Sequence, residues 1–301
     1  MLVSRSSKFG ISGVQSQGKI PVDVVMQLVE RAGTMIPMSD TDLSKAADRK
    51  GQMRMVEIEH RLHLIDMQAI RNPTIEPESE LSTTDRKSSD LYSRELIELV
   101  SRTYNDIDSI FSRGGEVIDI SSAGYLLARS SIETSSYANW LMSISNVKTR
   151  AFQAYKLFYQ NCKNIREVFK EIGRTDVSDF SNLGMRATAQ LMEKDIPGKD
   201  SKKLESPCTY STVIKNADEA FGRYKRRNVY TGLTAWRMCS AIVHGNAFLD
   251  DVFLTKSIET EVEQPSRKMV AKYSALSLVL LPAIENLEFC CHQFGAQCLE
   301  Q

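Results

Sequence analysis

The stretch that decides the fold runs from Tyr230 to Asn246 and reads YTGLTAWRMCSAIVHGN. Thr231 or Thr234 can cap a helix here, because a hydroxyl ahead of an apolar run accepts a hydrogen bond from a free backbone N–H of the first turn. At the far end, Gly245 and Asn246 are residue types that adopt the left-handed conformation closing a helix. The stretch therefore predicts one short helix with both of its ends marked.

This helix carries an arginine and a histidine in an R-x6-H pattern. Arg237 and His244 are seven positions apart, so at roughly 100° per residue they fall within about 20° of each other on one face. Histidine exchanges protons near neutral pH, and arginine presents a planar fork that suits a phosphate. Together they could bind a phosphodiester and move a proton at a 2′-hydroxyl without a metal. A structural role is the alternative, in which His244 donates to the last helix carbonyls and Arg237 pairs with a core carboxylate such as Glu133.

A second informative pattern predicts a helix from Val117 to about Ser145. Its apolar and aromatic positions follow the i, i+3, i+4, i+7 spacing, and two charges, Arg129 and Glu133, interrupt that stripe. Charges are almost never fully buried unless they are paired, and four-residue spacing lets these two pair directly. The pattern fits either an internal salt bridge or a polar pocket. The residues that would shape such a pocket are Arg129, Glu133, Tyr137, Trp140 and Ser240.

Helical periodicity extends over most of the chain, and it predicts an all-α, multi-helix bundle. Short alternation near 247–262 predicts a β hairpin or an extended arm beside the bundle. The domain prediction is a flexible arm at 1–20, a helical N-terminal extension at 21–72, a linker at 73–87 and a main helical domain at 88–301. The further helices predicted are 21–33, 39–71, 88–111, 150–173, 178–194, 209–228 and 265–295.

The composition excludes a function that depends on a large net charge of the whole protein. With 38 basic and 38 acidic residues the formal net charge is zero, so no overall field draws the protein to nucleic acid or to a membrane. Any binding of anions must be local. The basic run of Arg223, Lys225, Arg226 and Arg227 is either a solvated face or a rim that guides phosphates.

The absence of several common motifs narrows the kinds of reaction that the sequence predicts. The six cysteines form no C-x-x-C pair, and the chain has no P-loop, dinucleotide fingerprint or zinc motif, so we expect neither a metal nor a cofactor. The longest apolar run, Ala275 to Ile284, is about half of what a membrane-spanning helix needs. No secretory signal is recognisable. We therefore expect a cytoplasmic protein without a membrane segment.

An all-helical chain with R-x6-H near a helix end resembles the HEPN superfamily, helical proteins of prokaryotic defence and toxin–antitoxin systems. The resemblance covers roughly residues 117–295. Many members are metal-independent endoribonucleases that act as dimers, which implies that Arg237 stabilises the scissile phosphate and His244 transfers protons. It also implies RNA, a second copy of the chain, and an antitoxin or defence protein as partners, in stress or phage defence.

Two segments refine this resemblance. ARSSIETSSYANWL (128–141) and SAIVHG (240–245) are similar to uncharacterised, mostly actinobacterial helical proteins. Met238 follows the arginine where active HEPN members commonly carry a polar residue, and Asn246 stands where one HEPN variant has a tyrosine. The alternative function is a non-catalytic helical interaction module, or a ligand sensor that uses the aromatic residues Tyr137 and Trp140.

Overall fold

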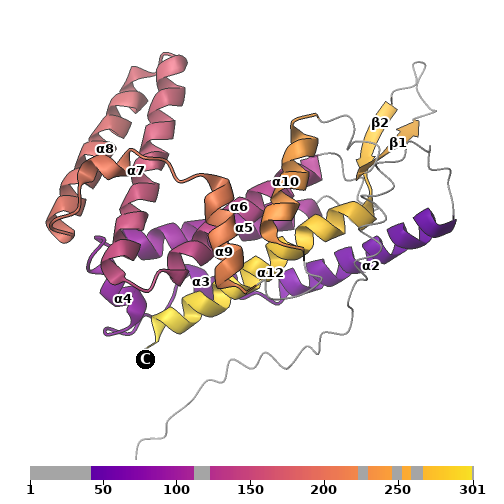
Figure 1. Ribbon diagram of the computed structural model, residues 1–301, viewed down its shortest axis with the longest axis horizontal. Helices are drawn as coiled ribbons and strands as arrows, with labels where there is room; N and C mark the ends of the chain where they lie inside the picture. Colours follow the sequence, from indigo (N-terminus) through magenta and orange to yellow (C-terminus); the bar gives the residue numbers. More distant parts are fainter. Residues whose placement is uncertain (1–41, 112–122, 223–229, 246–252, 259–266, 300–301) are drawn as a thin grey trace, which may run out of the picture. The chain divides into compact units, whose positions relative to one another are not determined.

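The computed structural model describes residues 42–111, 123–222, 230–245, 253–258 and 267–299. Within them the fold is all-α, a multi-helix bundle with one small hairpin, as the sequence predicts (Figure 1). The helices are α2 (Asp42–His63), α3 (Met67–Arg71), α4 (Glu80–Asp85), α5 (Leu91–Phe111), α6 (Ala123–Ser143), α7 (Val147–Glu171), α8 (Thr175–Asp195), the 3-10 helix η1 (Ser201–Leu204), α9 (Tyr210–Ala220), α10 (Gly232–Val243) and α12 (Tyr273–Cys298).

The last helix, α12, is the centre of the main core. It packs along α2 and α6 and also contacts α5 and α10 (Figure 1). Leu276, Leu280, Ile284 and Leu287 are fully buried along its length. By length and composition α12 passes the test for a membrane span, with a mean hydropathy of 1.4 over its most apolar window, but 67% of that window is buried inside the protein. A core helix gives the same combination.

Small polar residues let α6 and α12 approach closely. Asn286 donates from its amide to the hydroxyls of Ser135 and Ser136 at 3.2 and 3.3 Å. Asn139 in turn donates to the carbonyl of Asn286, and the thiol of Cys290 donates to Asn139 at 3.0 Å. Because every one of these buried groups finds a partner, a polar stripe is accommodated in the core at little cost.

A second, smaller core lies between α7, α8 and η1. Its buried side chains are Leu91, Ala151, Phe152, Tyr155, Tyr159, Met185, Met192, Ile196 and Leu204. The aromatic side predicted for residues 150–173 is thus core, with Phe152, Tyr155 and Tyr159 facing α8 and η1. Tyr155 also donates its phenolic hydroxyl to Asp195 at 2.5 Å, which ties the end of α8 to the middle of α7.

The structure corrects the domain prediction around residues 73–87. That segment is not a linker, because it contains α4 and buries Leu81 and Thr84 in the bundle. The backbone N–H of Glu76 also donates to the carbonyl of Cys298, and residues 39–301 form one compact unit. The sequence signal failed because the two prolines mark short turns between packed elements.

The helix predicted for 39–71 is two helices. Asp66 interrupts it by capping α3, accepting from the N–H groups of Gln68 and Ala69 at 3.0 and 3.1 Å. The arm at 1–20 and the helix at 21–33 lie outside the described residues.

The predicted hairpin is present, displaced along the chain from 247–262. Strand β1 (Leu254–Ile258) pairs antiparallel with β2 (Arg267–Ala271), so that Leu254 lies opposite Ala271. The final helix therefore begins at Tyr273, and the prediction that it begins near residue 265 is wrong.

Candidate active site at the end of α10

Helix α10 is held at its N-terminus by two separate groups. Thr231 accepts from the N–H of Thr234 at 3.1 Å, which confirms the predicted cap. The buried carboxylate of Asp218, from α9, accepts from the N–H groups of Gly232 and Leu233 at 2.9 and 3.0 Å. A negative charge at a helix N-terminus accepts hydrogen bonds from the free N–H groups and interacts favourably with the positive end of the helix dipole. These contacts fix the axis of α10 against α9.

At the other end of α10, His244 is the C-terminal capping residue. Gly245 follows with φ of +70°, the left-handed conformation predicted from the sequence. The backbone N–H of His244 donates to the carbonyl of Ser240, and that of Gly245 to the carbonyl of Ile242, at 3.0 Å each. The backbone at this position is therefore ordered by hydrogen bonds, while the imidazole itself is exposed.

The cation beside His244 is Arg129 of α6. Its Nη1 lies 3.5 Å from Nε2 of His244. A guanidinium can only donate, and Nε2 accepts in this contact only in the tautomer that carries the ring proton at Nδ1. The contact brings together two residues that are 115 positions apart in the sequence.

Arg129 is itself held in place from two sides. Its Nε donates to Oε1 of Glu133 at 3.0 Å, one turn further along α6. Its guanidinium also lies over the ring of Trp236, 5.6 Å from the ring centroid, and the indole N–H of Trp236 donates to the same Glu133 oxygen at 2.7 Å. The three side chains thus form a closed unit between α6 and α10.

Arg237 has a different environment from Arg129. It is exposed, and among the described residues it forms no hydrogen bond or ion pair. By helix geometry it shares a face with His244, about two turns or ~10 Å away along the axis. The structure therefore brings Arg129 next to His244, and Arg237 lies on the same side of α10 with no partner in the part of the chain that the structure describes. Arg129, rather than Arg237, forms the predicted ion pair with Glu133.

Ser240 lies between Arg237 and His244 on this helix. Its hydroxyl oxygen is buried and has no hydrogen-bond partner within the described part of the chain. An unsatisfied buried hydroxyl costs about 1–3 kcal/mol, so a bound water or ligand atom at this point would be stabilising.

The predicted aromatic residues lie on the other side of Glu133. The rings of Tyr137 and Trp140 meet edge to face, and Tyr210 of α9 packs on Tyr137 in the same way at 5.8 Å. Tyr137 donates its hydroxyl to the carbonyl of Cys208 at 3.2 Å, and burial raises its pKa well above the usual value. Burial and the nearby Glu133 also raise the pKa of Tyr210. These rings fill the space next to the charged unit.

Sequence reasoning missed Trp236 and Tyr210. Trp236 carried a usable signal, because an indole N–H that becomes buried requires an acceptor and Glu133 is a carboxylate within an apolar stripe. Tyr210 could not be found, since its contact depends on how α9 packs. The basic run Arg223, Lys225, Arg226 and Arg227 lies outside the described residues.

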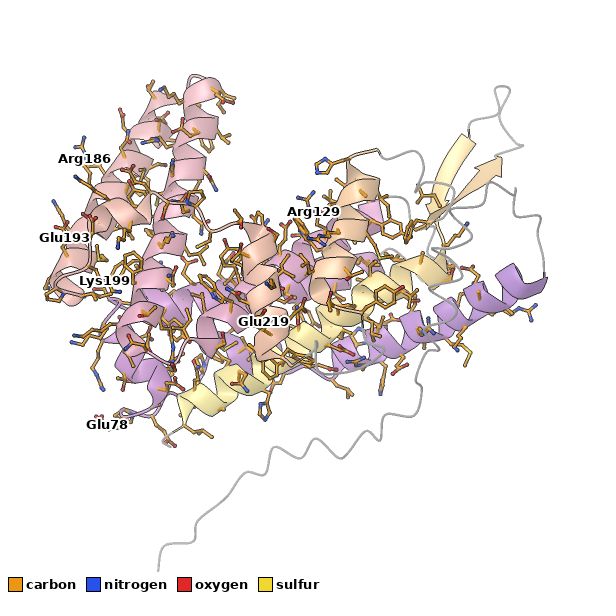
Figure 2. All side chains as sticks on the ribbon, in the orientation of Figure 1. Glu78, Arg129, Arg186, Glu193, Lys199 and Glu219 are labelled. Atoms are coloured by element: carbon orange, nitrogen blue, oxygen red, sulfur yellow. The ribbon has the colours of Figure 1, made fainter. Side chains whose placement is uncertain are left out.

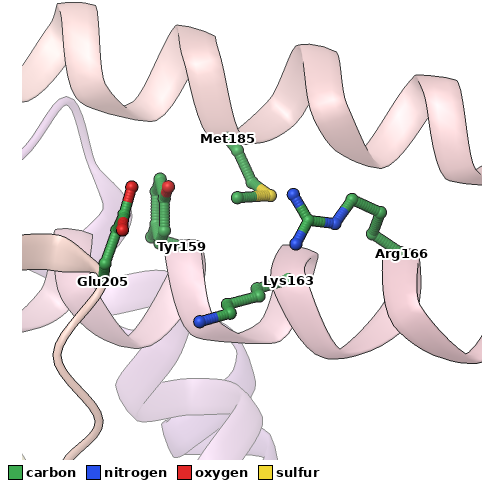
Figure 3. Close-up of a pocket in the computed structure, with 5 residues that line it drawn as sticks. All are labelled: Tyr159, Lys163, Arg166, Met185 and Glu205. Carbon is green, nitrogen blue, oxygen red and sulfur yellow. The ribbon is translucent and has the colours of Figure 1, made fainter.

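A separate hollow lies between α7 and α8. It has a volume of about 250 Å³ and is lined by Tyr159, Lys163, Arg166, Met185 and Glu205 (Figure 3). It lies on a part of the bundle away from α10 (Figure 1). Among the described residues no cluster of three or more His, Cys, Asp or Glu side chains could hold a metal ion.

The site is thus an exposed imidazole, a braced guanidinium, and a guanidinium and a buried hydroxyl that have no partner among the described residues, on adjoining faces of α6 and α10. Comparison with known proteins adds no family to this geometry: no family model, no curated protein and no solved structure matches the chain.

Proposed function

We propose that the chain is a metal-independent endoribonuclease of HEPN type that acts in stress or phage defence. The observation that carries the proposal is the 3.5 Å contact between exposed His244 and Arg129, with Arg129 braced by Glu133 and Trp236. A proton-transfer group beside a fixed cation is the minimum that phosphodiester cleavage requires when no metal takes part.

In this reaction neutral His244 accepts the proton of the 2′-hydroxyl next to the scissile phosphate. The 2′-oxygen attacks phosphorus, the bond from phosphorus to the 5′-oxygen breaks, and the leaving oxygen takes a proton from solvent. The products are a 2′,3′-cyclic phosphate and a 5′-hydroxyl. Because the attacking oxygen belongs to the ribose, the substrate must be RNA.

The two arginines have distinct roles in the proposal. Arg237, which is exposed and has no described partner, binds the phosphate oxygens and stabilises the charge that builds up on them. Arg129 is a positioning residue: it lies beside Nε2 of His244, and that nitrogen leaves the contact when it accepts the proton, because its single lone pair cannot accept from both groups. Ser240, whose hydroxyl oxygen is buried, lies between Arg237 and His244 on the same face of α10.

The same proposal includes partners and location. RNA is the substrate, the chain acts as a homodimer, and an antitoxin or defence protein controls it. The protein works in the cytoplasm and not in a membrane, and its chemistry uses no metal and no cofactor.

A non-catalytic interaction or ligand-sensing module is the second candidate. One observation favours it: the Arg129–Glu133–Trp236 unit is satisfied internally, as in a structural network. On that alternative the exposure of His244 has no chemical consequence, and neither the wild type nor His244→Ala cleaves RNA.

The experiment compares RNA cleavage by four proteins in excess chelator: wild type, His244→Ala, Arg237→Ala and His292→Ala. His292 is an exposed histidine on α12 and serves as the matched control. We expect His244→Ala to lower the rate by about 10²–10⁴-fold. Arg237→Ala should lower it markedly, and His292→Ala should leave it unchanged. Equal rates for all four proteins, or no cleavage by the wild type, would overturn the proposal.

A further inference from the structure

The hollow between α7 and α8 has charges of opposite sign at its two ends. Its volume is about 250 Å³, and it is lined by Tyr159, Lys163, Arg166, Met185 and Glu205. Figure 3 shows Glu205 beside Tyr159 at one end and Arg166 at the other. Because this volume lies just below the ~300–1,000 Å³ of small-molecule pockets, it admits one compact ligand.

Helix geometry places two cations on the wall that α7 contributes. Tyr159, Lys163 and Arg166 stand at positions i, i+4 and i+7, so they share one face of the helix within about 60°. The first and last of these positions are ~10 Å apart along the helix axis. Both cations are half-buried, and Lys163 has no hydrogen-bond or ion-pair partner among the described residues. An ammonium group next to a guanidinium is a place for anions.

Arg166 can donate on the side that faces the hollow. Its Nε and Nη2 donate to the exposed carboxylate of Glu167, a solvated pair of a kind that contributes little to stability. Its Nη1 lies 3.5 Å from Oδ1 of Asn182, which is longer than an ordinary N–H···O bond. Nη1 can therefore donate to a carboxylate of a ligand without the loss of a strong contact.

The acidic end of the hollow is held by contacts on both sides of Glu205. Gln160 of α7 donates from its amide to the carbonyl of Leu204 at 2.5 Å. One turn earlier on α7, Nζ of Lys156 donates to the hydroxyl of Ser206 at 3.0 Å. These bonds attach both neighbours of Glu205 to α7, so its carboxylate is held at the hollow.

The hydroxyl of Tyr159 lies close to both charged ends. Burial raises the pKa of Tyr159, the charge of Glu205 raises it further, and Arg166 lowers it. The hydroxyl also donates to the Glu205 carboxylate. Since one phenol is influenced by both charges, a single small ligand can extend from one charge to the other.

Gly184 sets the spacing of α7 and α8 beside the hollow. A Cβ added to this glycine would lie 3.1 Å from Sγ of Cys162. The close contact is one position before Met185 on α8 and one position before Lys163 on α7. The hollow is thus a preformed opening next to a tight helix–helix contact.

A ligand that matches this lining has two anionic groups and one cationic group on a short chain. Two carboxylates pair with Lys163 and Arg166, and an ammonium group pairs with Glu205, which when ionised can only accept. An extended glutamate separates its amine from its side-chain carboxylate by about 5 Å, and a hydrogen bond of ~2.8 Å at each end extends that length to ~10 Å. Tyr159 and Met185 supply an apolar wall for its methylene groups.

We propose that the hollow binds an acidic amino acid such as glutamate, with its carboxylates on Lys163 and Arg166 and its ammonium group on Glu205. This site is separate from the proposed RNA-cleaving site, since α7 and α8 lie apart from α10 (Figure 1). Its binding is measured without RNA, so the result does not depend on whether the chain cleaves RNA.

Isothermal titration calorimetry on the full chain compares glutamate with three analogues that each lack one charged group. Glutarate lacks the amine, 4-aminobutyrate lacks one carboxylate, and glutamine lacks the side-chain charge. Glutamate should bind with a Kd below about 1 mM. Each analogue should bind at least about tenfold more weakly, because one hydrogen-bonded charge pair is missing.

Three variants assign the groups to their places. Lys163→Met should weaken glutamate at least about tenfold. Glu205→Ala should weaken glutamate but strengthen glutarate, because the carboxylate that repels a ligand without an amine is gone. Arg186→Met is the matched control: Arg186 is an exposed cation next to Met185 in sequence, and it projects outward from α8 (Figure 2). It should leave binding unchanged, and circular dichroism checks the helical content of all three variants.

Absence of glutamate binding at millimolar concentration would overturn the proposal. Equal affinities of the wild type for glutamate and glutarate would also overturn it. A Glu205→Ala variant that weakens both ligands alike would show that Glu205 maintains the shape of the hollow and does not bind an amine.

Discussion

The indole N–H of Trp236 on α10 donates to Oε1 of Glu133 on α6 at 2.7 Å, the same oxygen that Arg129 engages. This hydrogen bond joins two helices that are 103 residues apart in sequence and fixes the cation next to His244. The position of the candidate base therefore depends on a tertiary contact and not on α10 alone.

Trp236→Phe removes the N–H donor and keeps a ring over Arg129. We expect the free energy of unfolding to fall by about 1–2 kcal/mol more than in Trp140→Phe, because a partly buried carboxylate oxygen loses a donor. Trp140 also lies at the edge of the core and is changed in the same way, so it controls for lost ring volume. Urea denaturation measures both variants. Equal losses would show that the Trp236 hydrogen bond contributes nothing.

Arg150 is a buried guanidinium at the start of α7. It pairs with Glu80 of α4, donates to the carbonyl of Ile144 at 2.8 Å and lies 5.6 Å from the ring centroid of Tyr92. Arg150→Met should cost about 2–4 kcal/mol, near the lower end for buried pairs because Glu80 is 27% exposed. Lys148→Met, at an exposed position of the same helix, should be near neutral in the same denaturation experiment. If Arg150→Met left the free energy of unfolding unchanged, the anchoring of α4 by α7 would be contradicted.

Much of the bundle follows from local signals in the sequence. The Thr231 cap, the left-handed Gly245 and the helix ending at Phe111 were all predicted, because each depends on residues within one turn. The helical content of α4 was missed, since a six-residue helix is stabilised by Arg150 and its packing rather than by its own pattern.

Some contacts of the candidate site were likewise predictable from local sequence, and others were not. Helical spacing was enough to put Arg237 and His244 on one face and to pair Arg129 with Glu133. It could not show that Arg129 reaches His244, because that contact requires α6 to pack against α10.

Glu95 gives the protein a pH-dependent stability. It is 9% exposed on α5, where burial, with a smaller contribution from Glu98, raises its pKa to about 7 from an ordinary 4.5. The folded state thus holds this proton more tightly than the unfolded state. Stability from this group is complete below pH 4.5 and is lost as the pH rises to 7, by about 2–3 kcal/mol.

Glu95→Gln should remove that pH dependence and make the protein more stable than the wild type at pH 8. Glu98→Gln, at an exposed neighbouring position, should change the profile little. Guanidinium unfolding at pH 5, 6, 7 and 8 measures the effect. If the wild type and Glu95→Gln show parallel profiles, the carboxylate does not titrate in this range.

Gly51 sets the closest approach between α2 and α12. An added Cβ would lie 2.5 Å from Cα of Ser274 and closer still to the neighbouring backbone atoms. Asp48 reinforces the contact by accepting from the N–H of Ser274 at 3.1 Å. Gly51→Ala should therefore destabilise by about 1–3 kcal/mol.

Gly295→Ala is the matched control, because Gly295 is in α12 and its added methyl group would meet nothing within 4 Å. This substitution should stabilise by about 0.5–1 kcal/mol through helix propensity. Thermal unfolding distinguishes the two. A Gly51→Ala variant as stable as Gly295→Ala would contradict the packing of α2 on α12.

The most direct test of His244 as a base is the chemistry of the cleaved ends. A labelled RNA and the same oligonucleotide with one 2′-deoxy nucleotide at the cleavage point are incubated with the protein in excess chelator. We expect the RNA to yield a 2′,3′-cyclic phosphate and a 5′-hydroxyl, with no cleavage at the deoxy position and a rate about 10²–10⁴-fold lower for His244→Ala. Cleavage at the deoxy position, or products that carry a 5′-phosphate, would show that the 2′-hydroxyl is not the nucleophile. His244 would then not be the base that removes its proton.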